Sequence, residues 1–587
     1  MASTTSAPTL ACDLLVIGSG AGGLSAAVTA AHRGLKVLVV EKETHYGGTT
    51  AWSGGWMWIP RNPLATAAGI TEDAAAPLSY LRHELGAHFD EARARAFLDN
   101  GPRMVEFFSA HTALQFIDGN AMPDFHGNTP DAARGGRSVC AAPFDARRLG
   151  EHIHTLKPPL PETTLWGMGI ASGAELRHFL NALRKPASCW FVAKKLLAYG
   201  RDLLLHRRGM RLVNGNALVG RLAASAFEAG VEMRMNTPAR RLLMEEGRVV
   251  GAVVGTAQGD VHIQARRGVV LACGGFPFDP ARIQALLPHA PSGSEHWSAA
   301  SRGNTGDGLR LGESAGGVVA RDMQEAAALA PVSLVPRRDG SVAHFPHLIE
   351  RAKPGLIAVT QAGKRFVNEA DSYYDFMRGL IRATPAGAAV EAWLVCDHAF
   401  IRHYGLGAVK PAPVPMGAML KSGYLRRGKT LAGLAAACGI DAAGLQATVA
   451  SYNPLAREGR DPDFAKGETP YNQIQGDAAA GWPNACMAPI ERGPFYAVRV
   501  VPGSLGTFAG LRTDAQARVL DARGQPIAGL YAGGNDMNSI MGGNYPSGGI
   551  TLGPAMTFGY LAALHAAGVS NADSQAIQPE PEYSSVT

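Results

Sequence analysis

The sequence of 587 residues is poor in cysteine and contains no long apolar run. Its seven cysteines stand apart from one another and form no C-x-x-C pair, which argues against a disulfide framework and a cysteine-bound metal cluster. No stretch reaches the roughly 18 consecutive apolar residues of a membrane-spanning helix, and residues 1–9 lack the basic start and apolar core of a secretory signal. These absences predict a cytoplasmic protein with reduced thiols and no metal site.

Charged residues are also scarce, at 18% of the chain, and the formal net charge is only +6. Because no basic segment is interleaved with aromatic residues, nucleic acid is not expected as a partner. Hydrophobic residues make up 46% of the chain, and 71 residues are glycine. A chain of this length exceeds what a single hydrophobic core supports. The composition therefore predicts an α/β enzyme of two domains.

The first motif is a glycine-rich turn that directly follows a predicted buried strand over residues 14–17. Gly18, Gly20 and Gly23 have the G-x-G-x-x-G spacing of a dinucleotide-binding turn. In such a turn the first glycine allows the sharp bend, the second lets a diphosphate approach the backbone, and the third lets the following helix pack on its strand.

The other parts of a dinucleotide-binding unit follow in order. We expect a helix over residues 24–33 and a second strand over 36–40, which ends at Glu41, whose carboxylate can accept hydrogen bonds from a ribose. A second loop, G-G-T-T-A-W-S-G-G over residues 47–55, comes next. Glycine and hydroxyl groups in that place suit a further diphosphate and an isoalloxazine ring, for which an NAD-binding domain has no use. The two loops together predict FAD.

These segments resemble the flavoprotein family of soluble fumarate reductases and 3-ketosteroid dehydrogenases. The resemblance implies an α/β fold, in which a Rossmann-like FAD-binding domain of the glutathione-reductase type carries an inserted α+β catalytic domain. We place the first part of the FAD-binding domain at residues 1–290, with a helical insertion at about 66–205, the catalytic domain at 291–492 and the second part of the FAD-binding domain at 493–570. The polar residues 571–587 are predicted to form a disordered tail.

Later segments return to the cofactor. Residues 214–229 have a helical pattern, residues 231–239 alternate like a strand, and residues 267–276 form a predicted buried strand that ends at glycines. A last glycine-rich stretch leads into a helix over 555–567, whose N-terminus would stabilise negative charge on a reduced flavin.

The motifs and the resemblance together give a set of residues predicted to bind FAD. They are Gly18, Gly20, Ala21, Gly22, Gly23, Glu41, Lys42, Gly47, Gly48, Thr49, Thr50, Ser53, Gly54, Gly55, Ala239, Ala272, Gly274, Asn304, Asp307, Asn535, Gly548, Thr551 and Leu552. His45 precedes the second loop, but its neighbours do not match those of covalent flavoproteins. We therefore expect FAD to be bound non-covalently.

Two segments narrow the chemistry. In G-K-R-F-V-N-E-A-D-S-Y-Y-D, residues 363–375, a fumarate reductase would have a proton-delivering arginine after the glutamate, whereas this chain has tyrosines. In 3-ketosteroid dehydrogenases the tyrosine taken to abstract the substrate proton follows Asn-Glu by four residues, and Tyr373 falls on that spacing. Tyr374 is the alternative candidate for this role.

The second segment is N-Y-P-S-G-G, residues 544–549. The last arginine of the chain is Arg523, so the dicarboxylate clamp of the fumarate reductases is missing here. Tyr545 and the backbone N–H of Gly549 suit a single carbonyl oxygen, which they would stabilise as it becomes negative. Ser547 completes the candidate catalytic set because Tyr-Pro-Ser-Gly is similar to the segment of the 4-dehydrogenases, in which that serine assists catalysis.

The match to the 1-dehydrogenases departs at Phe125, which stands where they have a catalytic-site tyrosine. We therefore expect an FAD-dependent enzyme that introduces a double bond next to a ring ketone, with 1- or 4-dehydrogenation of a 3-ketosteroid as the first candidate. A smaller cyclic ketone, an ene reductase like the fumarate reductases and a non-enzymatic flavin-binding protein are the alternatives.

The expected partners are a small hydrophobic ketone and an external electron acceptor. Residues 190–208 form an amphipathic and basic segment that suits an anionic bilayer, although an ordinary surface helix has the same pattern. Peripheral contact with the inner membrane is therefore the alternative to a purely cytoplasmic location.

Overall fold

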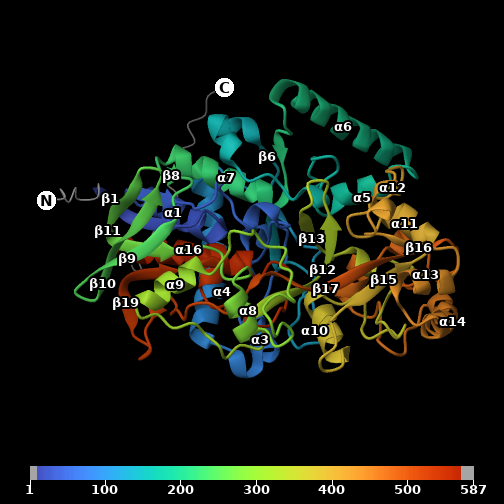
Figure 1. The fold of residues 1–587 in the computed structure, drawn as a ribbon. Helices are drawn as coiled ribbons and strands as arrows, with labels where there is room; N and C mark the ends of the chain where they lie inside the picture. The colour runs from blue at the N-terminus through green and yellow to red at the C-terminus, as the bar shows by residue number, and fades with distance from the viewer. Residues whose placement is uncertain (1–8, 570–587) are drawn as a thin grey trace.

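The computed structural model describes residues 9–569, and its largest sheet has eight strands (Figure 1). Six of them follow one another across the sheet in the order β18 (Arg518–Leu520), β19 (Pro526–Ala532), β11 (Gly259–Leu271), β1 (Thr9–Ile17), β2 (Val37–Val40) and β8 (Glu232–Arg234). The remaining two, β10 (Arg248–Thr256) and β9 (Ala239–Glu245), pair in turn onto β11.

The centre of this sheet is parallel. Strand β1 pairs in parallel with both β2 and β11, and β11 pairs in parallel with β19. Its residues Leu14–Val16 are completely buried because helices cover the sheet. This arrangement confirms the predicted Rossmann-like α/β fold, and the predicted strand over 36–40 is present as β2.

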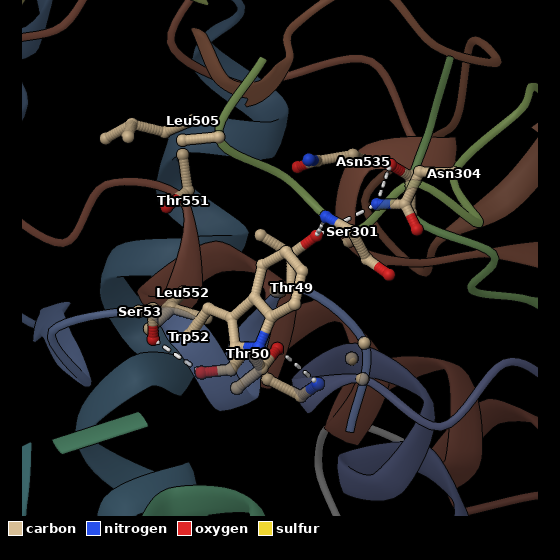
Figure 2. Close-up of a pocket in the computed structure, with 18 of the residues that line it drawn as sticks. Thr49, Thr50, Trp52, Ser53, Ser301, Asn304, Leu505, Asn535, Thr551 and Leu552 are labelled. Carbon is tan, nitrogen blue, oxygen red and sulfur yellow. Dashed lines mark hydrogen bonds between the residues drawn. The ribbon is translucent and has the colours of Figure 1, made fainter. Parts of the chain in front are cut away.

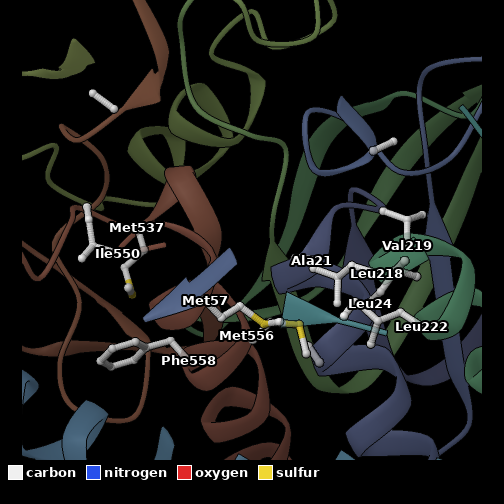
Figure 3. Close-up of a cluster of buried hydrophobic side chains, with 14 of the residues drawn as sticks. Ala21, Leu24, Met57, Leu218, Val219, Leu222, Met537, Ile550, Met556 and Phe558 are labelled. Atoms are coloured by element: carbon white, nitrogen blue, oxygen red, sulfur yellow. The ribbon is translucent and has the colours of Figure 1, made fainter. Parts of the chain in front are cut away.

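Three helices pack together beside the sheet: α1 (Ala21–His32), α7 (Asn214–Glu228) and α16 (Leu552–Ala566). Figure 3 shows Ala21 and Leu24 of α1 facing Leu218 and Leu222 of α7, with Met556 of α16 in the same buried cluster. Helix α1 begins directly after Gly20, three residues before the predicted start at residue 24. The predicted helices over 214–229 and 555–567 are present as α7 and α16.

The strand predicted over residues 231–239 is wrong in its length. Glu232–Arg234 pair with the sheet as β8, and Ala239 begins the separate strand β9. Asn236 then adopts a left-handed φ of 52°, and the N–H groups of Asn236 and Thr237 donate to the carbonyl oxygens of Glu43 and Glu41. These bonds turn the chain toward the end of β2, so the strand cannot continue.

A second, six-stranded sheet lies on the other side of the molecule (Figure 1). Its strands are β13 (Val342–Pro346), β12 (Ala327–Pro336), β17 (Phe495–Thr507), β15 (Ala392–Cys396), β14 (Leu356–Val359) and β16 (Arg426–Gly428). Strand β17 pairs with β12, β15 and β16, so the chain stays in this sheet beyond residue 493, where the sequence predicts its return to the FAD-binding domain. The division into domains otherwise remains a prediction.

Short helices surround the two sheets. They are α8 (Pro280–Leu286), α9 (Asp307–Ser314), α10 (Tyr373–Ala383), α11 (His398–Tyr404), α12 (Gly417–Lys421), α13 (Leu431–Cys438), α14 (Ala442–Glu458) and α15 (Pro470–Gln475).

The segment between β2 and α7 contains both helices and short strands. Its helices are α2 (Pro63–Ala67), α3 (Ala76–Leu85), α4 (Glu91–His111), α5 (Ala174–Leu180) and α6 (Pro186–His206). Its strands are β3 (Trp56–Trp58), β4 (Phe116–Asp118), β5 (Ser138–Ala141) and β6 (Phe144–Asp145), and β6 pairs with β7 (Arg211–Leu212). Within residues 9–569, no helix combines the length and the hydropathy needed to cross a membrane.

A buried ion cluster fixes the segment that leads to α10. Both carboxylate oxygens of Glu369 accept from Arg365 at 2.8 Å, and the Lys466 ammonium lies 3.1 Å away. Arg365 also contacts both oxygens of Asp461, at 2.9 and 2.8 Å. Burial alone would raise the pKa of Glu369, but the charges of Arg365 and Lys466 lower it to about 2. Arg365 and Glu369 of the segment 363–375 therefore have a structural role.

We predict that Glu369→Gln lowers the free energy of unfolding by about 3–5 kcal/mol at neutral pH, because it leaves buried cations without their counter-charge. The lowered pKa means that the wild-type contribution is complete above the unfolded-state pKa near 4.5 and is lost as the pH falls through about 2. Urea unfolding at about pH 7 and pH 3.5 should therefore show a smaller difference at the lower pH.

The matched control is Glu91→Gln, which removes an exposed partner of Arg82 and Arg95. It should leave the free energy of unfolding nearly unchanged, because exposed ion pairs contribute little to stability. Equal losses in the two variants would contradict a stabilising role for the buried cluster.

Candidate active site

A large cavity extends from the C-terminal ends of β1 and β2 to the second sheet, and Figure 2 shows part of its lining. Thr49 and Trp52 project from the loop after β2, with Asn304 and Asn535 on one side of Thr49 and the start of α16 on the other. Most of the predicted cofactor residues line this cavity: Gly18, Gly20, Ala21, Gly22, Glu41, Lys42, Gly48, Thr49, Thr50, Ser53, Gly54, Gly55, Ala239, Ala272, Gly274, Asn304, Asp307, Asn535, Gly548, Thr551 and Leu552.

The backbone around the N-terminus of α1 fits a dinucleotide. The cap residue Gly20 has no side chain to offer, and the first turn of the helix contains no acid. The Ala21 N–H donates to the Thr50 hydroxyl at 3.0 Å, and the other N–H groups of this turn can face an anion. A Cβ at Gly48 or at Gly534 would meet no protein atom within 4 Å, and both glycines line the cavity. The cavity therefore leaves space beside bare backbone where a diphosphate and a ring system can approach.

Polar side chains tie the walls of this part of the cavity together. One Glu41 oxygen accepts from the Ser19 hydroxyl at 2.6 Å, and the other accepts from the backbone N–H of Glu43 at 3.0 Å. Lys42 forms an ion pair with Asp307. The Thr49 hydroxyl accepts from Asn304 Nδ2 at 3.0 Å, which joins the second loop to the region before α9.

Two of the predicted cofactor glycines, Gly23 and Gly47, do not line the cavity. A Cβ at Gly23 would lie 2.1 Å from the carbonyl oxygen of Gly18, so this glycine serves the close packing of helix on strand that the motif predicts. Gly47 has a φ of 114°, and its N–H donates to the Ser19 hydroxyl at 3.0 Å. Both glycines therefore influence the backbone conformation around the site, but neither lines the cavity.

At its other end the cavity is lined by phenols. Tyr373 is the first residue of α10, and Tyr545 lies in the loop before α16. Their ring centroids are 5.0 Å apart with the planes at 82°, and their hydroxyl groups interact. Phe125 packs against both rings, at 5.7 Å from Tyr373 and 5.8 Å from Tyr545. The structure thus brings together two residues that are far apart in the sequence.

Gly549 lies beside these phenols with a φ of 96°. Its carbonyl oxygen accepts from the N–H groups of Trp58 and Gly553, at 3.1 and 2.9 Å. A Cβ at this position would lie 2.7 Å from the Trp58 nitrogen, so only glycine fits. No acceptor within the described residues receives the Gly549 N–H, which leaves it available to a ligand in the cavity.

Ser547 lies elsewhere than a catalytic role requires. Its side chain is buried and is absent from the cavity lining. It lies beside Asp124, whose carboxylate accepts from Trp58 and Arg137. The catalytic role predicted for Ser547 therefore has no support from its position.

Tyr374 also points away from the cavity. Its hydroxyl donates to the carbonyl oxygen of Gly543 at 2.6 Å. This bond holds the loop that carries Tyr545, so of the two neighbouring tyrosines only Tyr373 has access to a ligand.

The phenols of Tyr373 and Tyr545 are buried. Burial raises the pKa of Tyr545 to about 12 and raises that of Tyr373 well above its ordinary value. Behind them His126 lies between Glu84, at 2.5 Å, and Asp375, at 2.9 Å. Burial opposes the charged form of His126, but bonds to Asp375 and Glu84 raise its pKa to about 11. His126 therefore carries a positive charge at neutral pH.

Two further residues of the site carry no recognisable signal in the sequence. Tyr471 of α15 lines the cavity, and its ring centroid lies 4.5 Å from that of Phe125. Arg351 is completely buried, and its charge acts on the phenols of Tyr373 and Tyr471. Neither residue belongs to a motif with recognisable spacing.

The FAD binding domain family matches residues 13–552 of the sequence. The chain belongs to this family. FAD is its cofactor, and the residues described above fit that cofactor at the end of the cavity near α1.

Several members of this FAD-binding family cover nearly the whole chain. A 4-oxocyclohex-2-ene-1-carboxylate 5-dehydrogenase of Sinomonas cyclohexanicum is 39% identical over 96% of this chain and 95% of the relative. A 3-oxosteroid 1-dehydrogenase of Mycobacterium tuberculosis is 37% identical over 94% of this chain and 98% of the relative.

Among solved structures, a 3-ketosteroid Δ1-dehydrogenase of Sterolibacterium denitrificans in complex with 1,4-androstadiene-3,17-dione is similar. It matches with a TM-score of 0.88 and 38% identity, over 95% of this chain and 99% of the other. The predicted family, the fold class and the FAD cofactor are thereby confirmed.

We predict that Glu41→Gln weakens FAD binding by about 1.5–3 kcal/mol, the worth of a hydrogen bond to a charged group, which corresponds to roughly 10- to 150-fold in Kd. Titration of the apoprotein with FAD, followed by flavin fluorescence, measures the change. Glu232→Gln on β8 is the control, since it removes an exposed carboxylate beside Arg234 and should leave the affinity unchanged.

Heat or acid denaturation should release the flavin of the wild-type protein into the supernatant. Flavin that stays with the denatured chain would contradict the prediction of non-covalent binding.

Proposed function

We propose that this FAD-dependent oxidoreductase introduces a double bond next to the carbonyl group of a 3-ketosteroid. The observation that carries the proposal is the position of Tyr373, Tyr545 and the unpaired Gly549 N–H at one end of the FAD cavity. One proton acceptor and two hydrogen-bond donors converge there on the space that a ring ketone would fill.

The roles of these groups follow from their chemistry. The Tyr545 hydroxyl and the Gly549 N–H donate to the ketone oxygen, and they bind it more tightly as negative charge builds up on it. Tyr373 takes the proton from the α-carbon, whose C–H electron pair becomes part of the new double bond. The chemistry that FAD supplies is acceptance of a hydride from the β-carbon. An external electron acceptor then has to remove the two electrons.

The charges of the cavity favour a neutral substrate. Among the described residues that line it, the charged ones are Glu41, Lys42, Glu43 and Asp307. Lys42, the single cation among them, is paired with Asp307 at the end of the cavity near β2. The lining near the phenols is apolar or uncharged, with Met122, Leu505 and Gln475 among it. This lining supports a steroid over a carboxylate-bearing ring ketone or a dicarboxylate.

The new double bond is proposed at carbons 1 and 2 of the steroid. The 4-dehydrogenase alternative rests on the serine of Tyr-Pro-Ser-Gly, and Ser547 is buried beside Asp124. The similarity to the Δ1-dehydrogenase structure, at 38% identity over 95% of this chain, supports the same choice.

We also propose that the protein contacts anionic membranes through α6 while it remains cytoplasmic. This helix stands at the edge of the molecule, away from both sheets (Figure 1). The side chains of Trp190, Leu197 and Leu204 are 62%, 72% and 87% exposed. Residues 190–208 contain five basic side chains and a single acidic one, so their charge complements that of anionic lipid.

A second cavity beneath α6 supports an access route for an apolar substrate. It is lined by Ala198, Tyr199 and Leu203 of the helix. Trp52 and Leu348 line both this cavity and the FAD cavity, so the two cavities share a wall. A ketone that leaves the bilayer at α6 would therefore be next to the active site.

The substrate proposal predicts that anaerobic mixing with 4-androstene-3,17-dione bleaches the flavin and yields the 1,4-diene. Tyr373→Phe should lower kcat about 10²–10⁴-fold with little change in product binding, because it removes the base alone. Tyr545→Phe should lower kcat about 10²–10³-fold and also weaken binding of the ketone, because it removes one oxyanion donor. Stopped-flow absorbance and mass spectrometry of the products are the measurements.

Tyr46→Phe is the control for these variants, since Tyr46 is a buried tyrosine bonded to the His152 carbonyl oxygen. Bleaching by 4-oxocyclohexanecarboxylate but by no steroid would replace the steroid with the smaller ketone. Turnover of reduced dye with fumarate, together with no reaction of any ketone, would favour an ene reductase. A flavin that responds to none of these compounds would identify a non-enzymatic protein.

The membrane proposal predicts that the wild-type protein sediments with vesicles of phosphatidylcholine and phosphatidylglycerol, and less with phosphatidylcholine alone. The double variant Leu197→Glu/Leu204→Glu should lose most of this binding and keep its turnover of detergent-dispersed substrate. Met244→Glu, at an exposed position on β9, is the control. Equal sedimentation of the three proteins would refute contact through α6.

A further inference from the structure

Arg351 is a buried cation that has no carboxylate partner. Its side chain is 1% exposed. Its guanidinium donates to the carbonyl oxygens of His347 at 3.0 Å, Glu369 at 2.8 Å and Asp371 at 3.1 Å. The charge also lies 4.8 Å from the ring centroid of Phe376. Every hydrogen bond that it makes in the described chain ends on a carbonyl oxygen.

Such an arrangement is costly on its own. Removing a cation from water costs several kcal/mol, and carbonyl dipoles recover only part of what a carboxylate would. Hydrogen-bond donors are enough to hold the turn before α10 in place, and they need no net charge. The turn alone therefore does not account for a buried cation. The carboxylates of Glu350, Asp371 and Glu369 act on this charge from a distance without bonding to it. A nearby phenol that becomes negative during the reaction would add to them.

The phenols of the active site are such groups. Arg351 donates to the carbonyl oxygen of Asp371, two residues before Tyr373, and its charge acts on the phenols of Tyr373 and Tyr471. Burial raises the pKa of Tyr373 well above its ordinary value, the phenols Tyr545 and Tyr471 add to the rise, and the Arg351 charge opposes it.

The other charged groups around Tyr373 bond to further side chains. Asp375 on α10 accepts from His126 at 2.9 Å and from Ser372 at 2.5 Å. Asp371, in the turn before α10, accepts from Asn472 of α15 at 3.0 Å. The positive charge of His126 is shared between Asp375 and Glu84.

We propose that Arg351 is a positioning residue that stabilises the anionic form of Tyr373 and so makes this phenol an effective base. The inference rests on the proposed function, in which Tyr373 takes the substrate proton. Arg351 is absent from the cavity lining, so it acts through its charge on the tyrosine and not through contact with the ketone.

The chain contains a matched control. Arg221 on α7 is also buried, and it donates to the carbonyl oxygens of Ala142, Ala113 and Pro143 at 2.8, 2.6 and 2.7 Å. Its charge lies 5.2 Å from the ring centroid of Phe144. Arg221 thus reproduces the surroundings of Arg351 but lies outside the active-site lining.

The experiment compares Arg351→Gln, Arg351→Lys and Arg221→Gln as FAD-loaded enzymes. A cation favours the anion of Tyr373, so its removal raises the pKa of the phenol, and kcat/KM falls on the rising limb of the pH profile. An opposite charge at close range is worth about 1–3 pKa units, so Arg351→Gln should be roughly 10- to 1000-fold slower there. The rising part of the pH profile of kcat/KM for Arg351→Gln should reach its plateau at a correspondingly higher pH.

Arg351→Lys separates charge from hydrogen-bond geometry. A single ammonium cannot span the carbonyl oxygens of His347, Glu369 and Asp371, but it keeps the charge. We expect Arg351→Lys to recover most of kcat/KM, while Arg221→Gln keeps the wild-type profile whatever it does to the melting temperature. Equal losses in the glutamine and lysine variants would overturn the proposal, as would a wild-type profile for Arg351→Gln.

A second readout does not depend on turnover. The ultraviolet titration of tyrosinate, taken as the difference between each protein and its Tyr373→Phe counterpart, reports the pKa of this one phenol. We expect the pKa to rise by at least about one unit in Arg351→Gln. If the wild-type enzyme oxidised no ketone, the proposed function would fail while this titration still tested the charge effect. An unchanged pKa in an active enzyme would refute the inference alone.

Discussion

The close contact between helices α1 and α16 holds the two ends of the active site together. A Cβ at Gly559 of α16 would lie 2.3 Å from the carbonyl oxygen of Gly22 in α1, so the helices meet backbone to backbone. The Ser25 hydroxyl donates to the Met556 carbonyl oxygen at 2.6 Å across the same interface. Because both helices begin at the cavity, this contact fixes the dinucleotide end relative to the loop that carries Tyr545 and Gly549.

From α16 the constraint passes to the catalytic groups through backbone bonds. The carbonyl oxygen of Pro546 accepts from the Tyr80 hydroxyl at 2.7 Å and from the Phe125 N–H at 2.9 Å. Phe125 in turn packs on Tyr373 and Tyr545. Phe125, at which the sequence departs from the 1-dehydrogenases, thus serves as an apolar support for both phenols. Tyr471, next to Phe125, is the third phenol of the lining.

The cofactor half of the site could be predicted from the sequence because its chemistry depends on local backbone shape. Gly18 and Gly20 occur at a fixed spacing, and each shapes the backbone of the same short turn. Tyr373 and Tyr545 were found through the resemblance, and only the fold shows that their rings meet. Tyr471 and Arg351 were missed because their effect depends on contacts between segments that share no motif.

Errors in the prediction have the same origin. The prediction of a catalytic role for Ser547 depends on the residues next to it in the sequence. In the structure its side chain lies beside Asp124, whose carboxylate accepts from Trp58 and Arg137. The strand predicted beyond residue 234 fails because the carbonyl oxygens of Glu41 and Glu43 take the N–H groups that the next ladder bonds would need. In both places a contact from a distant part of the chain outweighs the local pattern.

Burial imposes opposite demands on the two tyrosines. Burial strengthens the hydrogen bonds that Tyr545 and Gly549 would make to a negative ketone oxygen, because the local dielectric constant is low. The same burial raises the free energy of the Tyr373 anion. A base in this position therefore needs a source of positive potential that is itself buried. The N-terminus of α10, where Tyr373 is the first residue, supplies part of that potential. A buried arginine bonded only to carbonyl oxygens adds to it from outside the cavity lining, where it leaves the space for the ketone free.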